Sequence, residues 1–301
     1  MKNFTATRAE AGERLDRHLV KKLNGVSRQS VKSLIDAGRV KVNGKRVIIA
    51  KWEMNEGDRV EAALDGRGTK KEARRSFINV VYEDDDVVVV EKPAGAVVQA
   101  GERGGGTYVD DLRNYLKRKH KSRGANVKAV HRLDRDTSGL MVFAKSRAGE
   151  GLIEQFKRHN IERSYLAVVN GRVKGENGKI DLPIEKGDFG FGKRAAIGRN
   201  GRGLDALTLY DVKERYKDAT LVILRLRSGR THQARVHMAA IGHPIVGDKT
   251  YGGDKGLDFP RQALHSHQLN FKHPKDGRKM QFKSELPEDL YQLVDKLRDL
   301  D

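Results

Sequence analysis

Two aspartates and two arginines share one short segment that leads into an apolar stretch. The segment is HRLDRD (131–136), and apolar residues fill 140–144. Catalytic groups are commonly placed in loops held by a rigid scaffold. A neighbouring arginine favours the ionised form of a carboxylate, so either Asp134 or Asp136 is a candidate nucleophile at neutral pH. An ion-paired turn of purely structural role would use the same residue types.

A second polar segment, SGRTHQARVH (228–237), lies between a strand-like stretch and a predicted helix. Arg230 stands at the entrance of this helix, where backbone N–H groups and the helix dipole favour anions. It could hold a carboxylate or a phosphate there. Thr231 is a suitable N-cap residue, and that local role accounts for it without any part in chemistry.

Tyr165 opens a third candidate segment, the apolar stretch 165–170. An aromatic residue at the start of a buried strand is most simply a core residue. If it lay next to a carboxylate in a nucleic-acid site, it could instead stack on a base that has left its helix. The residue type alone leaves both interpretations open.

Other kinds of site are excluded or disfavoured by the residues present. The chain has no cysteine, which rules out disulfides and cysteine-ligated metals. Residues 187–193 resemble the start of a phosphate-binding loop, but Arg194 stands where Ser or Thr is required, so we reject an NTPase. Three histidines lie between 265 and 273 without a carboxylate-rich surrounding, and a metal site is therefore the less favoured interpretation.

The charge of the chain points to a polyanionic partner. Lys and Arg number 60 against 41 Asp and Glu, a formal net charge of +19 over 301 residues. Such an excess favours nucleic acid before an anionic membrane, with adaptation to high salt as the alternative. No apolar stretch approaches the roughly 20 residues needed to cross a bilayer. The N-terminus lacks the apolar core of a signal peptide. A cytoplasmic location without a membrane partner is therefore expected.

Residues 1–64 predict a small basic unit. The expected elements are helices at 16–24 and 28–37 and strands at 40–42, 47–49 and 59–63. Asn43-Gly44 is a strong signal for a hairpin turn. Basic side chains crowd this unit and offer a phosphate-binding patch. The residues of this patch that we expect to contact RNA are Arg28, Lys32 and Arg39.

The rest of the chain follows a polar stretch, 65–75, that we interpret as a linker. Strands are expected at 79–82, 87–91, 140–144, 165–170, 208–212 and 220–226. Helices are expected at 108–119, 149–158, 232–241 and 288–300. This irregular order predicts one α+β domain over 76–301, with a mixed or antiparallel sheet rather than a regular βαβ winding.

Five blocks of this sequence, in order, resemble the RluA-type pseudouridine synthases. The blocks are EKPAG (91–95), HRLDRDTSGLMVFAKS (131–146), SYLAVVNG (164–171), LRSGRTHQARVHMAAIGHPIVGDKTYG (226–252) and ALHSHQLNFKHP (263–274). Residues 13–60 resemble the S4 RNA-binding module that many of these enzymes carry in front. Together the resemblance covers almost the whole chain. It implies a mixed, mostly antiparallel sheet flanked by helices with a central cleft, preceded by a small S4-like domain.

The resemblance also implies roles for individual residues. Asp134 matches the family's nucleophilic aspartate, which moves the choice between the two aspartates to Asp134. Tyr165 matches the tyrosine that packs against the target base and is proposed to take part in proton abstraction. Arg230 matches the arginine that pairs with the aspartate. The residues expected to bind the substrate in the catalytic domain are His131, Arg132 and Leu264.

The activity implied by the resemblance is conversion of specific uridines to pseudouridine in structured RNA. Large-subunit ribosomal RNA is the expected substrate, with transfer RNA as the alternative, and the chemistry needs no metal or cofactor. We expect a monomer. A non-catalytic RNA-binding protein would suit the same charge, although it would not need the set of Asp134, Tyr165 and Arg230. A nucleoside or glycan hydrolase working through paired carboxylates would not need the charge or an S4-like unit.

Overall fold

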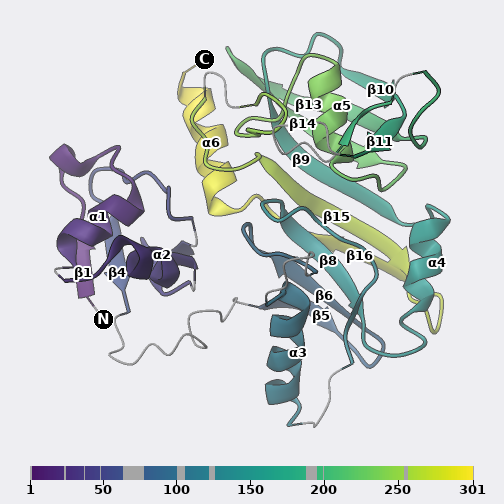
Figure 1. The fold of residues 1–301 in the computed structure, drawn as a ribbon, viewed down its shortest axis with the longest axis horizontal. Coiled ribbons are helices and arrows are strands. Elements are labelled where there is room, and N and C mark those ends of the chain that lie inside the picture. The colour runs from purple at the N-terminus through teal and green to yellow at the C-terminus, as the bar shows by residue number, and fades with distance from the viewer. Residues whose placement is uncertain are drawn as a thin grey trace. The chain divides into compact units, whose positions relative to one another are not determined.

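The protein is described by a computed structural model covering residues 2–23, 25–36, 38–47, 49–63, 78–99, 106–121, 126–187, 195–198, 200–253 and 257–300 (Figure 1). The predicted linker and most of the rejected phosphate-binding loop lie outside these ranges. The predicted domain limits therefore stay predictions. Contacts between Cα atoms divide the chain into two compact units, Met1–Asn79 with Pro93–Gly124, and Val80–Lys92 with Ala125–Asp301.

The first unit contains a four-stranded antiparallel sheet in the order β1-β4-β2-β3 and two short helices. Its elements are β1 (Lys2–Thr5), η1 (Arg8–Glu10), α1 (Leu15–Lys22), α2 (Arg28–Asp36), β2 (Val40–Val42), β3 (Lys45–Val47), β4 (Arg59–Ala62) and α3 (Tyr108–Lys119). Each of the two short helices buries an apolar face, with Leu15, Leu19, Val31 and Ile35 all 0% exposed. Thr107 and Asp110 form a capping box that starts α3 at the predicted residue.

The hairpin between β2 and β3 is tighter than the sequence suggested. Asn43 and Gly44 have φ angles of 53° and 76°, so both central residues of the turn are left-handed. A two-residue turn of this kind pairs the residues on either side of it, and Val42 is paired with Lys45. The strand predicted at 47–49 was therefore wrong by two residues.

The second unit is built on a mixed sheet in the order β10-β13-β14-β9-β15-β8-β6-β5, with β16 added to β15 and β7 to β8 (Figure 1). Its strands are β5 (Asn79–Glu83), β6 (Val87–Lys92), β7 (Lys128–Ala129), β8 (Ser138–Ala144), β9 (Glu162–Asn170), β10 (Asn177–Asp181), β13 (Leu207–Arg215), β14 (Ala219–Leu226), β15 (Leu264–Lys272) and β16 (Lys279–Lys283). The pairings described are antiparallel except that of β15 with β8. The predicted α+β class with a mostly antiparallel sheet is confirmed.

The central strand, β15, was missed in the sequence because its first half is polar. His265, Ser266 and His267 are buried, at 7% exposure or less. Each finds a partner on a neighbouring segment. The His265 ring lies 3.0 Å from the hydroxyls of both Ser138 and Ser284, and the Ser266 hydroxyl donates to the Leu140 carbonyl. Nδ1 of His267 donates to the Ser284 carbonyl at 2.6 Å. Polar residues satisfied in this way can occupy a core position that apolar patterning does not reveal.

Strands β8 and β15 approach closely where their parallel pairing begins. Gly139 has φ +110°, and a Cβ atom there would lie 2.3 Å from the backbone oxygen of Ser266. Only glycine fits this position. The contact fixes the end of the segment HRLDRD against the centre of the sheet.

Three helices and a small hairpin complete the second unit. They are α4 (Gly151–Lys157), α5 (Gln233–Ala240), α6 (Glu288–Asp299) and the pair β11 (Ile184–Lys186) with β12 (Ala195–Ile197). Helix α5 packs against β12, β13 and β14, and Figure 1 shows it beside β13 and β14. Six of its eight residues are buried, including Arg235 and His237. Charged residues are rarely buried without a partner, so Arg235 in this helix is expected to pair with a carboxylate.

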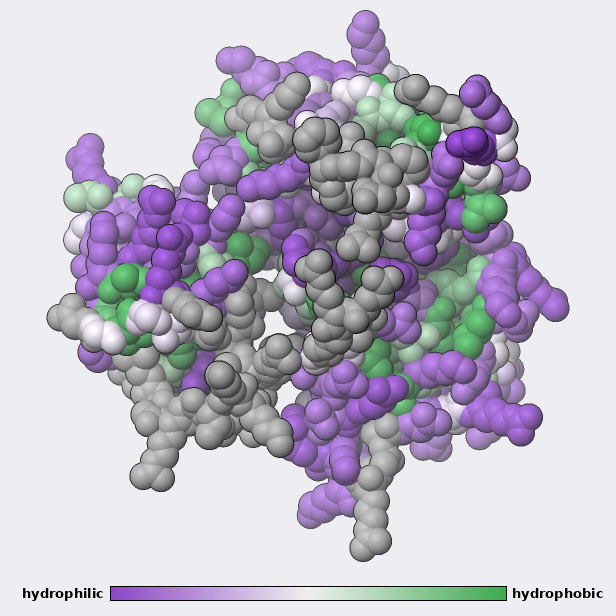
Figure 2. Space-filling model, viewed as in Figure 1, coloured by the Kyte–Doolittle hydropathy of each residue, from purple (hydrophilic) through white to green (hydrophobic). Residues whose placement is uncertain are grey.

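Hydrophilic residues cover most of the described surface that Figure 2 shows, in keeping with the charge of +19. Among the described residues, no helix is both long and apolar enough to span a membrane.

Candidate active site

A cavity of about 480 Å³ opens beside the first residue of β8 and is bounded by four chain segments. These are the loop 130–137, helix α4 with the turn after it, the start of β9 and the segment 226–235, which leads into α5; Leu264 of β15 also lines it. All belong to the second unit. The predicted residues that this cavity brings together are His131, Arg132, Asp134, Tyr165, Arg230 and Leu264.

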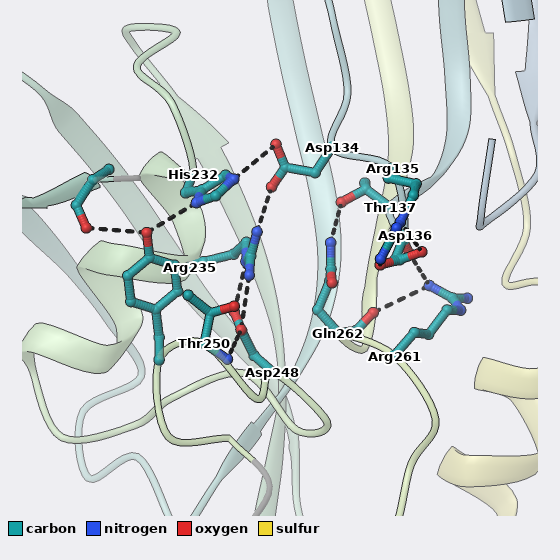
Figure 3. Close-up of polar contacts among 12 residues, drawn as sticks. Asp134, Arg135, Asp136, Thr137, His232, Arg235, Asp248, Thr250, Arg261 and Gln262 are labelled. Carbon is teal, nitrogen blue, oxygen red and sulfur yellow. Dashed lines mark hydrogen bonds and ion pairs between the residues drawn. The ribbon is translucent and has the colours of Figure 1, made fainter. Parts of the chain in front are cut away.

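Asp134 is held in this cavity by Arg235 and not by the predicted Arg230. Nη1 of Arg235 donates to Oδ2 of Asp134 at 3.1 Å (Figure 3). The Arg230 side chain lines the same cavity, but its Nε donates to the backbone oxygen of Asp205 at 3.0 Å. The predicted ion pair between Asp134 and Arg230 was therefore wrong, because Arg230 precedes α5 while Arg235 lies inside it.

Arg235 is itself clamped by a second carboxylate. Its Nε and Nη2 donate to the two oxygens of Asp248 at 2.6 and 2.8 Å, and the Thr250 backbone N–H donates to Asp248 (Figure 3). Burial by itself would lower the pKa of the guanidinium, but Asp248, and after it Asp134, outweigh that effect and raise it. Arg235 is thus a permanently charged fork with one arm for each aspartate.

Two buried basic side chains hold the backbone of the loop that carries Asp134. Nζ of Lys92 donates to the Arg135 carbonyl at 2.9 Å, and Nη1 of Arg261 donates to the Asp136 carbonyl at 3.1 Å. Arg261 is anchored in turn by Asp289 at the start of α6. Burial, followed by the charge of Arg261, lowers the pKa of Lys92 to about 7. These contacts bind the backbone of the loop and leave the Asp134 side chain to the cavity.

Asp136 lies apart from this network. Its carboxylate pairs with the neighbouring Arg135, whose side chain is 66% exposed, and it does not line the cavity. A surface pair of this kind contributes little to stability. Of the two aspartates that the sequence left open, Asp134 is the one that faces the cavity.

Tyr165 lies at the base of the cavity and is 5% exposed. It is paired with Leu224 on β14 and Ser266 on β15, so a central position in the sheet fixes its ring. Burial, together with the charge of Asp134, raises the pKa of its phenol. Tyr165 is therefore a neutral hydroxyl at neutral pH.

His131 lines the cavity, but its ring is used by the fold. Its Nε2 accepts the Val142 backbone N–H at 3.1 Å, and the ring stacks on Phe156 with centroids 4.5 Å apart. Burial lowers its pKa to about 3. The ring is thus a neutral hydrogen-bond acceptor that joins the loop to β8. The sequence predicted only that His131 binds the substrate and did not indicate this structural role.

The neutral histidines beside β8 should make this strand acid-sensitive. Burial lowers the pKa of both His131 and His265 to about 3, whereas an unfolded histidine titrates near 6.5. Below about pH 6.5 the unfolded chain binds more protons, so stability present above that pH is lost as the pH falls towards 3. We expect the unfolding free energy to drop by up to about 1.4 kcal/mol per pH unit for each histidine. Hydrogen exchange of the β8 amides between pH 7.5 and 5 measures this slope. His131→Gln should flatten it, whereas the same substitution at exposed His159 should not.

Arg132 and Leu264 also line the cavity. Arg132 is exposed in the loop, and Leu264 is 4% exposed at the first position of β15. Arg132 supplies a positive charge at the end of a long, exposed side chain, and Leu264 supplies a buried apolar wall. The basic residues predicted to contact RNA in the first unit include Arg28, 61% exposed in its side chain, and Lys32, also exposed. Arg39, half-buried, precedes β2 in the same unit.

Four residues around Asp134 were missed. They are Arg235, its partner Asp248, His232, whose Nε2 lies 3.9 Å from Oδ1 of Asp134, and Tyr251, whose ring faces the Arg235 guanidinium. A signal for the first was present, because a buried helix seldom contains an arginine without a carboxylate partner. The other three come from loops and from the first turn of α5, where the sequence shows no periodicity that would place them. Within the described ranges, no group of three or more His, Asp or Glu residues is arranged to hold a metal ion.

The chain is similar to known proteins over most of its length. The sequence-family model for RNA pseudouridylate synthase matches residues 86–240, and that for the S4 domain matches 13–60. An uncharacterised RNA pseudouridine synthase of Bacillus subtilis (strain 168) is 38% identical over 300 residues, covering 98% of each chain. Ribosomal large subunit pseudouridine synthase D of Haemophilus influenzae is 35% identical, covering 96% of this chain and 92% of its own. The solved structure of human RNA pseudouridylate synthase domain containing 4 superposes with a TM-score of 0.62 at 24% identity, covering 73% of this chain and 93% of its own.

Proposed function

This chain belongs to the RNA pseudouridylate synthase family and therefore isomerises uridine to pseudouridine in RNA, and we propose that it acts on large-subunit ribosomal RNA through the carboxylate of Asp134. The observation that carries the assignment to Asp134 is the asymmetry of its carboxylate. Oδ2 is bound by Arg235, whereas no residue in the described parts of the chain donates a hydrogen bond to Oδ1. One oxygen is thus held and the other is open to a substrate.

The reaction breaks the C1′–N1 bond of the target uridine, turns the uracil and joins C5 to C1′. The proton on C5 leaves and N1 gains one, so atoms and electrons balance without an oxidant, a reductant or an external energy source. Asp134 acts either covalently on the ribose or as a base towards it, and both routes need an ionised carboxylate. Arg235 favours this form and restricts its movement, because its other arm is fixed by Asp248.

The target nucleotide has to leave its stack to bring its ribose to Oδ1, which costs a few kcal/mol and least in a loop. In our proposal Tyr165 and Leu264, both buried, form the walls against which the base packs, and Arg132 at the rim helps to hold it out of the helix. Because its pKa is raised, the Tyr165 phenol is a proton donor. It can take up the C5 proton only after passing its own proton to N1, and this relay leaves the hydroxyl as it was at the start.

The choice of large-subunit ribosomal RNA rests on the relatives whose names state that substrate and on the S4 domain, and we propose a monomer acting in the cytoplasm. Pseudouridine mapping of total RNA from cells with and without the gene tests it. Sites that disappear from large-subunit RNA on deletion and return with the intact gene are expected. Sites lost only from transfer RNA would contradict this substrate and leave the chemistry intact.

Arg28 and Lys32 are proposed to contact RNA phosphates, because they lie one turn apart on α2 and both are exposed. Replacing both by Ala should weaken RNA binding and reduce the slope of log K against log salt by about 1 to 2, since each lost phosphate contact removes roughly one unit. Filter binding at several salt concentrations measures the slope. Lys296→Ala, an exposed change on α6 of the other unit, is the matched control; an equal slope in all three proteins would contradict the role of α2.

A further inference from the structure

His232 presents an unused ring nitrogen to the open oxygen of Asp134. Its Nε2 lies 3.9 Å from Oδ1 of Asp134, and both residues line the cavity (Figure 3). The backbone of His232 is left-handed, with φ 54° and ψ 22°, at the N-cap of α5. A non-glycine residue in this conformation is uncommon, and such strain gathers at functional sites where the surrounding structure enforces it.

A chain of hydrogen bonds determines which nitrogen of His232 carries the proton. The Tyr251 hydroxyl donates its only proton to the Ala195 carbonyl at 3.0 Å. It must therefore accept from Nδ1 of His232, which lies 2.9 Å away. The Tyr251 ring also stands against the Arg235 guanidinium, 5.1 Å from its centroid. Tyr251 thus fixes both the imidazole and the fork that holds Asp134.

The other nitrogen is left as a hydrogen-bond acceptor. Burial, together with the charge of Arg235, works against protonation of His232, opposed by Asp134 and Asp248, and its pKa is lowered. A neutral ring with its proton on Nδ1 has a lone pair on Nε2. Nε2 and Oδ1 are then two acceptors facing one another at a distance too long for a direct bond. Such a pair is suited to receive a donor from a third molecule.

We propose that Nε2 of His232 accepts a hydrogen bond from the 2′-hydroxyl of the target ribose and so makes the cavity selective for RNA over DNA. The inference rests on the proposed role of Asp134. Whether Oδ1 acts on C1′ or on the hydrogen of C2′, the 2′-oxygen is bonded to C2′ and must lie within a few ångström of Oδ1. Nε2 of His232 lies within that distance of Oδ1, whereas Arg235 binds the other oxygen, Oδ2. The 2′-hydroxyl is the group by which a protein distinguishes the two nucleic acids.

The test is a cycle of two substrates and two proteins. The substrates are a synthetic RNA carrying one mapped target uridine and the same RNA with a single 2′-deoxyuridine at that position. Wild type and His232→Phe are compared by single-turnover rate and by RNA dissociation constant, so a substrate that does not react still reports its binding. For each protein, the preference is the ratio of its values on the ribose and the deoxyribose substrates. We expect this preference to be about tenfold larger for the wild type than for His232→Phe, which corresponds to one hydrogen bond. Any effect of the deoxy group on the chemistry itself is common to both proteins and cancels.

Two further variants separate the contact from a general disturbance of the site. Tyr251→Phe keeps the ring beside Arg235 but removes the acceptor for Nδ1–H, and its preference for ribose should fall between those of wild type and His232→Phe. His159→Phe, a change to another histidine that lines the cavity, should keep the full wild-type preference. Equal ribose preferences in wild type and His232→Phe would overturn the proposal. Failure of the wild type to convert even the ribose substrate would instead contradict the proposed function.

Discussion

Asp134→Asn is expected to lower the single-turnover rate of pseudouridine formation by about four orders of magnitude or more, the scale seen when a reacting group is removed. The amide has nearly the shape of the carboxylate but carries no charge, so it can neither attack the ribose nor take a proton from it. Its oxygen can still accept the hydrogen bond from Arg235. RNA binding should therefore change much less than the rate. Release of tritium from 5-tritiated uridine in the mapped RNA measures the rate, and filter binding measures the affinity.

Asp136→Asn is the matched control for this experiment. The two aspartates lie two residues apart in one loop, but Asp136 pairs with exposed Arg135 and does not line the cavity. We expect its activity to stay within a few-fold of wild type. Full activity of Asp134→Asn, or an equal loss in both variants, would show that the reactive carboxylate lies elsewhere. Neither change should unfold the protein, since Arg235 keeps its pair with Asp248.

The helices could be predicted from the sequence to within two residues at most ends. Periodic apolar faces and capping residues are local signals, and α3 begins and ends where they indicate. The central strand could not be predicted in this way. Its buried His265 and Ser266 are compatible with the core only because Ser138, Ser284 and the Leu140 carbonyl lie opposite them, and a linear sequence does not show those partners.

The site shows the same division between local and tertiary information. The segment HRLDRD and Tyr165 could be selected from residue types and resemblance, but Arg230 was predicted as the partner of Asp134 and Arg235 is the residue that binds it. Arg230 stands at a helix entrance, which is a local reason to expect an anion there. Arg235 reaches Asp134 because α5 is buried against the sheet and because Asp248, 13 residues further on, orients its fork. Neither condition can be read from sequence spacing.

Arg235→Lys is expected to reduce pseudouridine formation by about a hundredfold or more, because an ammonium group cannot keep both aspartates in place as the planar fork does. Asp248, 1% exposed, should retain the lysine and leave Asp134 without its partner. Arg230→Lys is the control, since its backbone contact with Asp205 is not part of the fork. We expect it to affect RNA affinity more than the rate. A larger loss of rate in Arg230→Lys than in Arg235→Lys would contradict the pairing described here.

Arg235→Leu separates the structural role of this arginine from its role in the reaction. Removing the guanidinium leaves Asp248 buried and unpaired, which should cost about 3 to 5 kcal/mol in the free energy of unfolding. Adding Asp248→Asn removes the uncompensated charge and should restore part of that stability, measured by urea unfolding. Activity should not return with it, because Asp134 still lacks a cation that fixes Oδ2. Recovery of activity together with stability would mean that Arg235 serves only to hold α5 in the core. Persistent inactivity in a stable double variant would mean that the ion pair itself prepares the carboxylate for the ribose.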